Sequence, residues 1–155
     1  MTLRFTPIET ETARRYQTGG PDANGQLPER VIAEGTGNPC RHCLQMIPEG
    51  EPMLILAHRP FPRPQPYAEI GPIFLCAELC DPPDDLRAMP QILASPDYIL
   101  RGYGADDRIV YGTGAVVPTG QILAEAETRL ADPGVAYVHV RSARNNCYQL
   151  RIDRG

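Results

Sequence analysis

Lysine is absent from this sequence, and all 15 basic residues are arginine. The absence excludes the lysine-dependent sites of P-loop nucleotide binding, Schiff-base catalysis and protein kinases. Serine occurs only at Ser95 and Ser142, neither of which lies in a G-x-S-x-G turn, and the histidines are His42, His58 and His139. The composition therefore argues against a hydrolase built on a Ser-His-acid triad.

Long apolar runs are also missing. No window approaches the roughly 18 consecutive apolar residues of a membrane helix, and residues 1–7 contain no signal-peptide core. We therefore expect a cytoplasmic protein with no membrane partner. The formal net charge of −4 argues against a nucleic-acid partner. In a reducing compartment the five cysteines are expected to be thiols or metal ligands rather than disulfides.

The length of 155 residues, 42% of them hydrophobic, suits one globular domain over residues 1–155. The pattern predicts the α+β class, with a mostly antiparallel sheet and two or three short helices. The predicted strands are 3–8, 53–58, 73–76, 98–103 paired with 108–113, and 135–142 paired with 147–152. Helices are predicted over 9–17, over 81–93 and from Thr119 to the Asp132-Pro133-Gly134 stop. Residues 60–72 contain five prolines and are predicted to form an extended loop.

Four of the five cysteines form the pattern Cys40-x2-Cys43 followed by Cys76-x3-Cys80. Two thiolates separated by two residues in a tight turn direct both sulfur atoms into one tetrahedral site, which is how structural zinc sites are built. The pattern therefore predicts a zinc site with these four ligands, with His42 pointing outward. The two alternatives are inert thiols packed in the core, and a redox pair formed by Cys40 and Cys43.

A second group of polar residues gathers on the predicted C-terminal hairpin. Alternation along the strand places His139 and Arg141 on one face and Val138 and Val140 on the other. In the partner strand, Tyr148, Leu150 and Ile152 form the apolar face, and Gln149 and Arg151 lie on the other face. Arg101 and Tyr103 alternate together on their own strand and can add to this polar face.

A solvated sheet face is the simpler interpretation of this group. The alternative is an anion site in a small enzyme, with Arg101 and Arg141 as binding groups and His139 as the acid or base. Glu69 is expected to be a solvated loop acid.

Several short motifs carry a resemblance to a known family. They are Pro39-Cys40-Arg41-His42-Cys43-Leu44, Pro66-Tyr67, Gly71-Pro72-Ile73-Phe74, Arg101-Gly102-Tyr103 and Val140-Arg141-Ser142-Ala143. Together they resemble the bacterial domain-of-unknown-function family 1203 over nearly the whole chain. Because that family has no assigned activity, the resemblance implies a fold boundary and no chemistry.

The sequence thus favours a small cytoplasmic binding or interaction domain with a four-cysteine structural zinc site, whose partner is a small anionic ligand or a protein. An enzyme acting on an anionic metabolite and a thiol-redox protein are the alternative hypotheses.

Overall fold

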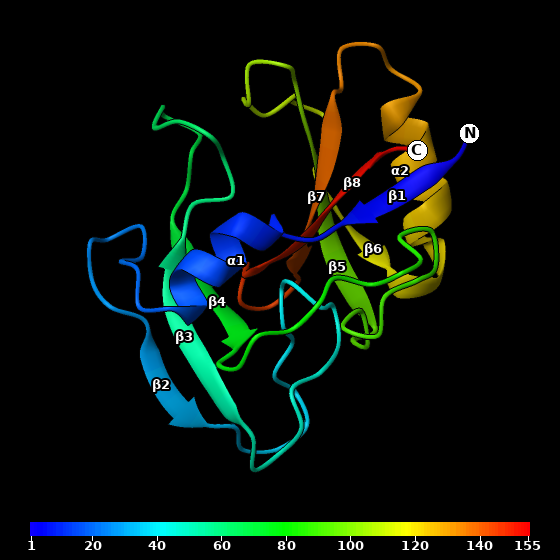
Figure 1. Cartoon of the computed structure of the whole chain (residues 1–155). Coiled ribbons are helices and arrows are strands. Elements are labelled where there is room, and N and C mark those ends of the chain that lie inside the picture. Colours follow the sequence, from blue (N-terminus) through cyan, green and yellow to red (C-terminus); the bar gives the residue numbers. More distant parts are fainter.

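Two antiparallel sheets and two short α-helices make up the computed structural model, which describes residues 1–155 (Figure 1). The five-stranded sheet has the order β1 (Leu3–Thr6), β8 (Tyr148–Arg154), β7 (Tyr137–Ser142), β5 (Asp97–Tyr103) and β6 (Ala115–Pro118). The three-stranded sheet has the order β2 (Glu29–Ile32), β3 (Pro52–His58) and β4 (Gly71–Cys76). The predicted α+β class is confirmed.

The helices are α1 (Thr10–Gln17) and α2 (Ile122–Leu130), with a 3₁₀ turn over Thr119–Gln121 before α2. Neither helix has the length and apolar character that a membrane crossing requires. Glu125 and Arg129, one turn apart on α2, form an ion pair with a nitrogen-to-oxygen distance of 2.7 Å. Thr119 does not cap α2, because its hydroxyl donates to the Ser95 carbonyl instead.

Each sheet has its own core. The larger core lies between the five-stranded sheet and α2, because Ile122, Ala126 and Leu130 recur at helical spacing and turn one face of α2 inward. The smaller core lies under the three-stranded sheet, where Ala13 and Tyr16 of α1 pack. In Figure 1, α1 lies between the two sheets.

The helix predicted over 81–93 is wrong: this stretch contains turns and irregular chain. Pro82, Pro83 and Pro90 each lack the backbone N–H that a helix needs. The segment is fixed by other contacts, since the N–H of Phe5 donates to the Leu86 carbonyl at 2.8 Å.

The pairing of 98–103 with 108–113 is also wrong beyond a single bridge between Tyr103 and Ile109, because β5 pairs with β6. The Thr113 hydroxyl accepts the N–H of Gly102 at 2.9 Å, in the place of a strand partner. Strand β2 was not predicted from the sequence.

A β-bulge changes the face on which Tyr148 lies. The pairing of β7 with β8 shifts by one residue between Val140 and Arg141, so that Arg141 lies opposite Tyr148. Tyr148 consequently packs with the smaller core, whereas Leu150 and Ile152 pack with the larger one. The prediction that all three share a face is wrong, because one inserted residue reverses the alternation.

Candidate metal centre

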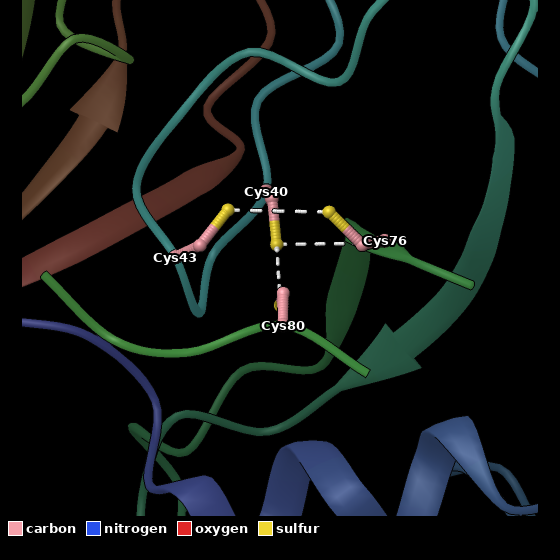
Figure 2. Close-up of side chains that lie close together, drawn as sticks. All are labelled: Cys40, Cys43, Cys76 and Cys80. Carbon is pink, nitrogen blue, oxygen red and sulfur yellow. Dashed lines mark hydrogen bonds between the residues drawn. The ribbon is translucent and has the colours of Figure 1, made fainter. Parts of the chain in front are cut away.

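Four sulfur atoms meet between the loop that precedes β3 and the end of β4 (Figure 2). Cys40 and Cys43 belong to that loop, Cys76 is the last residue of β4, and Cys80 lies on the segment that comes after it. Their sulfur atoms all lie within 4.8 Å of one another. The residues predicted as ligands are therefore brought together.

Backbone contacts explain how two segments so far apart in sequence meet. Cys40 and Phe74 form an isolated parallel bridge, and the N–H of Arg41 donates to the Phe74 carbonyl at 3.1 Å. These bonds attach the cysteine loop to β4 two residues before Cys76. The position of Cys40 is therefore fixed by the sheet edge rather than by the cysteines themselves.

The loop turns tightly after its first cysteine. The N–H of Leu44 donates to the carbonyl of Cys40 at 3.0 Å, which folds Cys43 back toward Cys40. Leu44 has a φ of 58°, a left-handed conformation that is unfavourable for a residue with a branched side chain. Its side chain is buried in the larger core, and this burial offsets the cost of the turn.

The distances suit one tetrahedral ion. The sulfur atoms of Cys40 and Cys80 are 3.9 Å apart, and those of Cys43 and Cys76 are also 3.9 Å apart. A Zn–S bond of about 2.3 Å gives a regular tetrahedron with edges of roughly 3.8 Å. A disulfide would need sulfur atoms about 2.05 Å apart. Four protein ligands would complete the coordination of such an ion, which is the arrangement of structural rather than catalytic metal sites.

Hydrogen-bond donors point at the sulfur atoms, as they do around thiolates. The N–H of Cys76 donates to the Cys40 sulfur at 3.4 Å, and the Gln17 amide donates to the Cys80 sulfur at 3.6 Å. Such donors spread the negative charge of a metal–thiolate group and orient its ligands.

His42 contributes to this set, contrary to the predicted outward position. Its side chain is 0% exposed, with Nδ1 at 3.3 Å from the Cys80 sulfur and Nε2 at 2.9 Å from the Thr10 hydroxyl. If Cys80 is a thiolate it can only accept, so Nδ1 carries the proton and Nε2 accepts from Thr10. The imidazole therefore links the sulfur site to the start of α1.

Helix α1 holds the second cysteine segment, which sequence reasoning missed. Arg14 donates to the Cys80 carbonyl at 2.6 Å, and Gln17 donates to the Cys76 carbonyl at 3.0 Å. Together with Thr10, these residues recur at helical spacing and form a polar stripe beside the buried pair Ala13 and Tyr16. That polar stripe is the signal that marks the helix as a support.

Hydrogen bonds within the cluster favour the thiolate at one cysteine and the thiol at another. Hydrogen bonds from neighbouring thiols, led by that of Cys40, and from His42 hold the pKa of the Cys80 thiol below its ordinary value. The pKa of Cys76 is raised, because its hydrogen bonds to neighbouring sulfurs, first of all Cys40, stabilise its protonated form. Cys80 is therefore the first of the two to become the thiolate that a metal requires.

A buried arginine lies beside the site. Arg41 donates from Nε to the Tyr148 carbonyl and from one terminal nitrogen to the Pro39 carbonyl, both at 2.8 Å. Desolvation lowers the pKa of its guanidinium to about 10, which leaves it charged at neutral pH. Arg41 thus places a positive charge next to Cys40 and ties the cysteine loop to β8.

The polar residues of the C-terminal hairpin are not on a solvated face, so that prediction is wrong. His139, Arg141 and Gln149 are buried. The proline-rich loop after β3 covers this face of the sheet, and the Phe61 ring packs on the His139 ring with centroids 5.0 Å apart. The loop itself was predicted, but its docking site was not.

Arg101 and Arg141 converge on Glu69, which sequence reasoning took for a solvated loop acid. Arg101 lies 3.2 Å from one carboxylate oxygen and Arg141 lies 3.5 Å from the other. His139 lies beneath aromatic rings including Tyr103 and Tyr137, and burial lowers its pKa well below the ordinary value. The two arginines therefore share a carboxylate, and the histidine is enclosed and neutral.

Residues 37–154 match the family described as "Protein of unknown function (DUF1203)". The chain belongs to the DUF1203 family. No curated protein and no solved structure matches it. The DUF1203 match includes all four clustered cysteines, Arg101, Arg141 and Glu69, whereas α1 and its polar stripe precede the matched residues.

Another buried histidine gives this DUF1203 chain a predictable response to acid. His58 is 8% exposed, and its Nδ1 lies 3.0 Å from the Tyr16 hydroxyl. Burial, and then the charges of Arg15, Arg59 and Arg41, lower its pKa to about 4. The unfolded chain, with an ordinary histidine pKa near 6.5, therefore binds more protons between pH 6.5 and 4, and stability falls as the pH falls through that window.

We expect His58→Asn to reduce this loss by about 2 kcal/mol between pH 7 and pH 5. Asparagine keeps a polar group near Tyr16 but cannot take up a proton. Urea unfolding of both proteins at the two pH values gives the difference, and groups that titrate alike in both cancel. An unchanged pH increment in the variant would show that His58 does not couple protonation to folding.

Proposed function

We propose that this protein is a zinc-stabilised binding domain in which Cys40, Cys43, Cys76 and Cys80 hold one structural Zn²⁺. The observation that carries the proposal is the approach of four sulfur atoms, from two distant segments, to within 4.8 Å of one another. Four soft sulfur donors at tetrahedral spacing favour zinc over Mg²⁺ or Ca²⁺, which take oxygen ligands.

The burial of Cys40 favours metal binding over thiol redox chemistry. An attacking thiolate has to reach a substrate disulfide, whereas Cys40 is 0% exposed. The sulfur atoms of Cys76 and Cys80 lie within the same cluster, although a redox motif requires only two cysteines. His42 and Gln17 donate toward Cys80, as expected around a permanent metal–thiolate group.

Metal analysis tests the proposal directly. The purified protein is expected to carry one equivalent of zinc per chain, and Cys76→Ser to carry much less, because three remaining thiolates bind zinc less tightly. Thiol titration of the folded wild-type protein should detect Cys147 alone. The other four thiols should become reactive when a strong chelator removes the metal.

The fifth cysteine supplies the matched control. Cys147 is half-buried like Cys76, but its sulfur lies 3.7 Å from the Asn145 carbonyl, outside the cluster. Cys147→Ser should therefore retain the full zinc content. The proposal is wrong if protein purified and refolded with zinc contains no metal and all five thiols titrate together.

A further inference from the structure

A small cavity lies between the β3–β4 connection and the turn that joins β7 to β8. Its volume is about 190 Å³, and its lining includes His58, Glu69, Arg141, Asn146 and Cys147. The cavity is separate from the sulfur cluster, and none of the four clustered cysteines lines it. A ligand in this cavity would therefore contact no residue of the proposed zinc site.

Arg141 is the unusual member of this lining. The side chain is 4% exposed, and only one terminal nitrogen has a partner, donating to the Asn146 carbonyl at 3.3 Å. The Nε atom and the other terminal nitrogen are buried with no hydrogen-bond acceptor. Buried donors without an acceptor are costly, and the cost is larger on a charged group. An acceptor at this position would remove that cost.

Glu69 does not satisfy these two nitrogens. Its carboxylate lies 3.5 Å from Nη1 of Arg141, the nitrogen that already donates to Asn146, and it also pairs with Arg101. The Glu69 side chain is 39% exposed, so it can swing into solvent. Two arginines facing one carboxylate leave a net charge of +1, which suits a second anionic group.

We propose that this cavity binds the carboxylate or phosphate group of a small metabolite, with Arg141 as the residue that binds the anion. The guanidinium offers two unpaired nitrogens, an arrangement that matches two oxygens of either group. Glu69, on the remaining nitrogen of Arg141, offsets part of the positive charge that attracts the ligand, and the turn residue Asn146 forms the adjacent wall of the cavity. The cavity volume restricts the ligand to a small molecule.

Cys147 reports occupancy, because it is a half-buried thiol on the cavity wall. The probes are inorganic phosphate and succinate, each at millimolar concentration and matched ionic strength, with the full chain. Alkylation of Cys147 by iodoacetamide is monitored by mass spectrometry of its peptide. We expect at least one probe to slow the reaction about fivefold or more, and the effective probe distinguishes a phosphate from a carboxylate site.

Three variants decide whether the protection comes from Arg141. Arg141→Gln should abolish it, and Glu69→Gln should lower the half-protecting concentration about tenfold by removing the negative charge beside the ligand. Arg144→Gln is the matched control, because it removes the same charge three residues away, at an exposed position of the turn after β7 and outside the cavity lining, and it should protect like wild type.

The proposal is overturned if neither probe protects Cys147, or if protection persists unchanged in folded Arg141→Gln. Circular dichroism establishes whether that variant folds. Should it fail to fold, Glu69→Gln still decides, since an unchanged half-protecting concentration in that variant also contradicts the proposal.

Discussion

Cys43→Ser is expected to lower the free energy of unfolding of the zinc-loaded protein by more than about 4 kcal/mol, a loss typical of removing a structural metal. The reason is that zinc binds the folded ligand set and not the unfolded chain, so its binding free energy becomes folding free energy. Without it, the sulfur atoms no longer join the cysteine loop to Cys76 and Cys80, and the backbone bond between Arg41 and Phe74 is left to attach the loop to β4. Urea unfolding monitored by circular dichroism gives the free energy.

Two comparisons make this result specific. Cys147→Ser replaces another half-buried cysteine with the same residue and should change stability by no more than about 0.5 kcal/mol. A chelator should destabilise wild type as much as the substitution does, and should leave Cys43→Ser unaffected. Equal stability of Cys43→Ser and Cys147→Ser in the presence of zinc would contradict the expectation.

Arg41→Met should cost about 3 kcal/mol of folding free energy and make chelator-induced zinc release about tenfold faster. The substitution keeps an unbranched side chain but removes the donors to the carbonyls of Pro39 and Tyr148. It also removes the positive charge beside Cys40. Release is measured with a chromogenic chelator, and stability by urea unfolding.

Arg87→Met is the matched control, because Arg87 is exposed and its side chain makes no hydrogen bond. Its zinc release and stability should equal those of wild type. If Arg41→Met loses stability but releases zinc at the wild-type rate, Arg41 holds the two sheets together without tuning the metal site.

The sequence was sufficient for the features that depend on local pattern. The spacing of Cys40, Cys43, Cys76 and Cys80 predicted a shared site, and their sulfur atoms do meet. The alternation in β7 predicted a hairpin with β8. The apolar spacing of Ile122, Leu123, Ala126 and Leu130 predicts one buried face of α2, and all but Leu123, which is 43% exposed, are buried. In each case the signal repeats within a few residues, as helix and strand periods do.

The features that failed depend on distant neighbours. Tyr148 lies on the unexpected face of β8 because of a β-bulge that the alternation of residue types does not reveal. His42 points inward because Thr10, more than thirty residues earlier in the chain, offers it a hydrogen bond. Glu69 is an isolated acid in sequence, and only the fold brings it to Arg101 and Arg141. Single-residue polarity carries no information about such partners.

The pairing of the first strand with the last has a consequence for biosynthesis. Leu3 of β1 lies opposite Arg154 of β8, so β1 leaves the ribosome long before the strand with which it pairs. Phe5, fully buried in the finished protein, is exposed throughout that interval. The segment from α1 to Cys80 depends less on β8, because α1, the three-stranded sheet and all four sulfur ligands are contiguous in the chain and only Tyr148 joins their core from β8. The segment from α1 to Cys80 can therefore begin to fold during translation, while the five-stranded sheet is still incomplete.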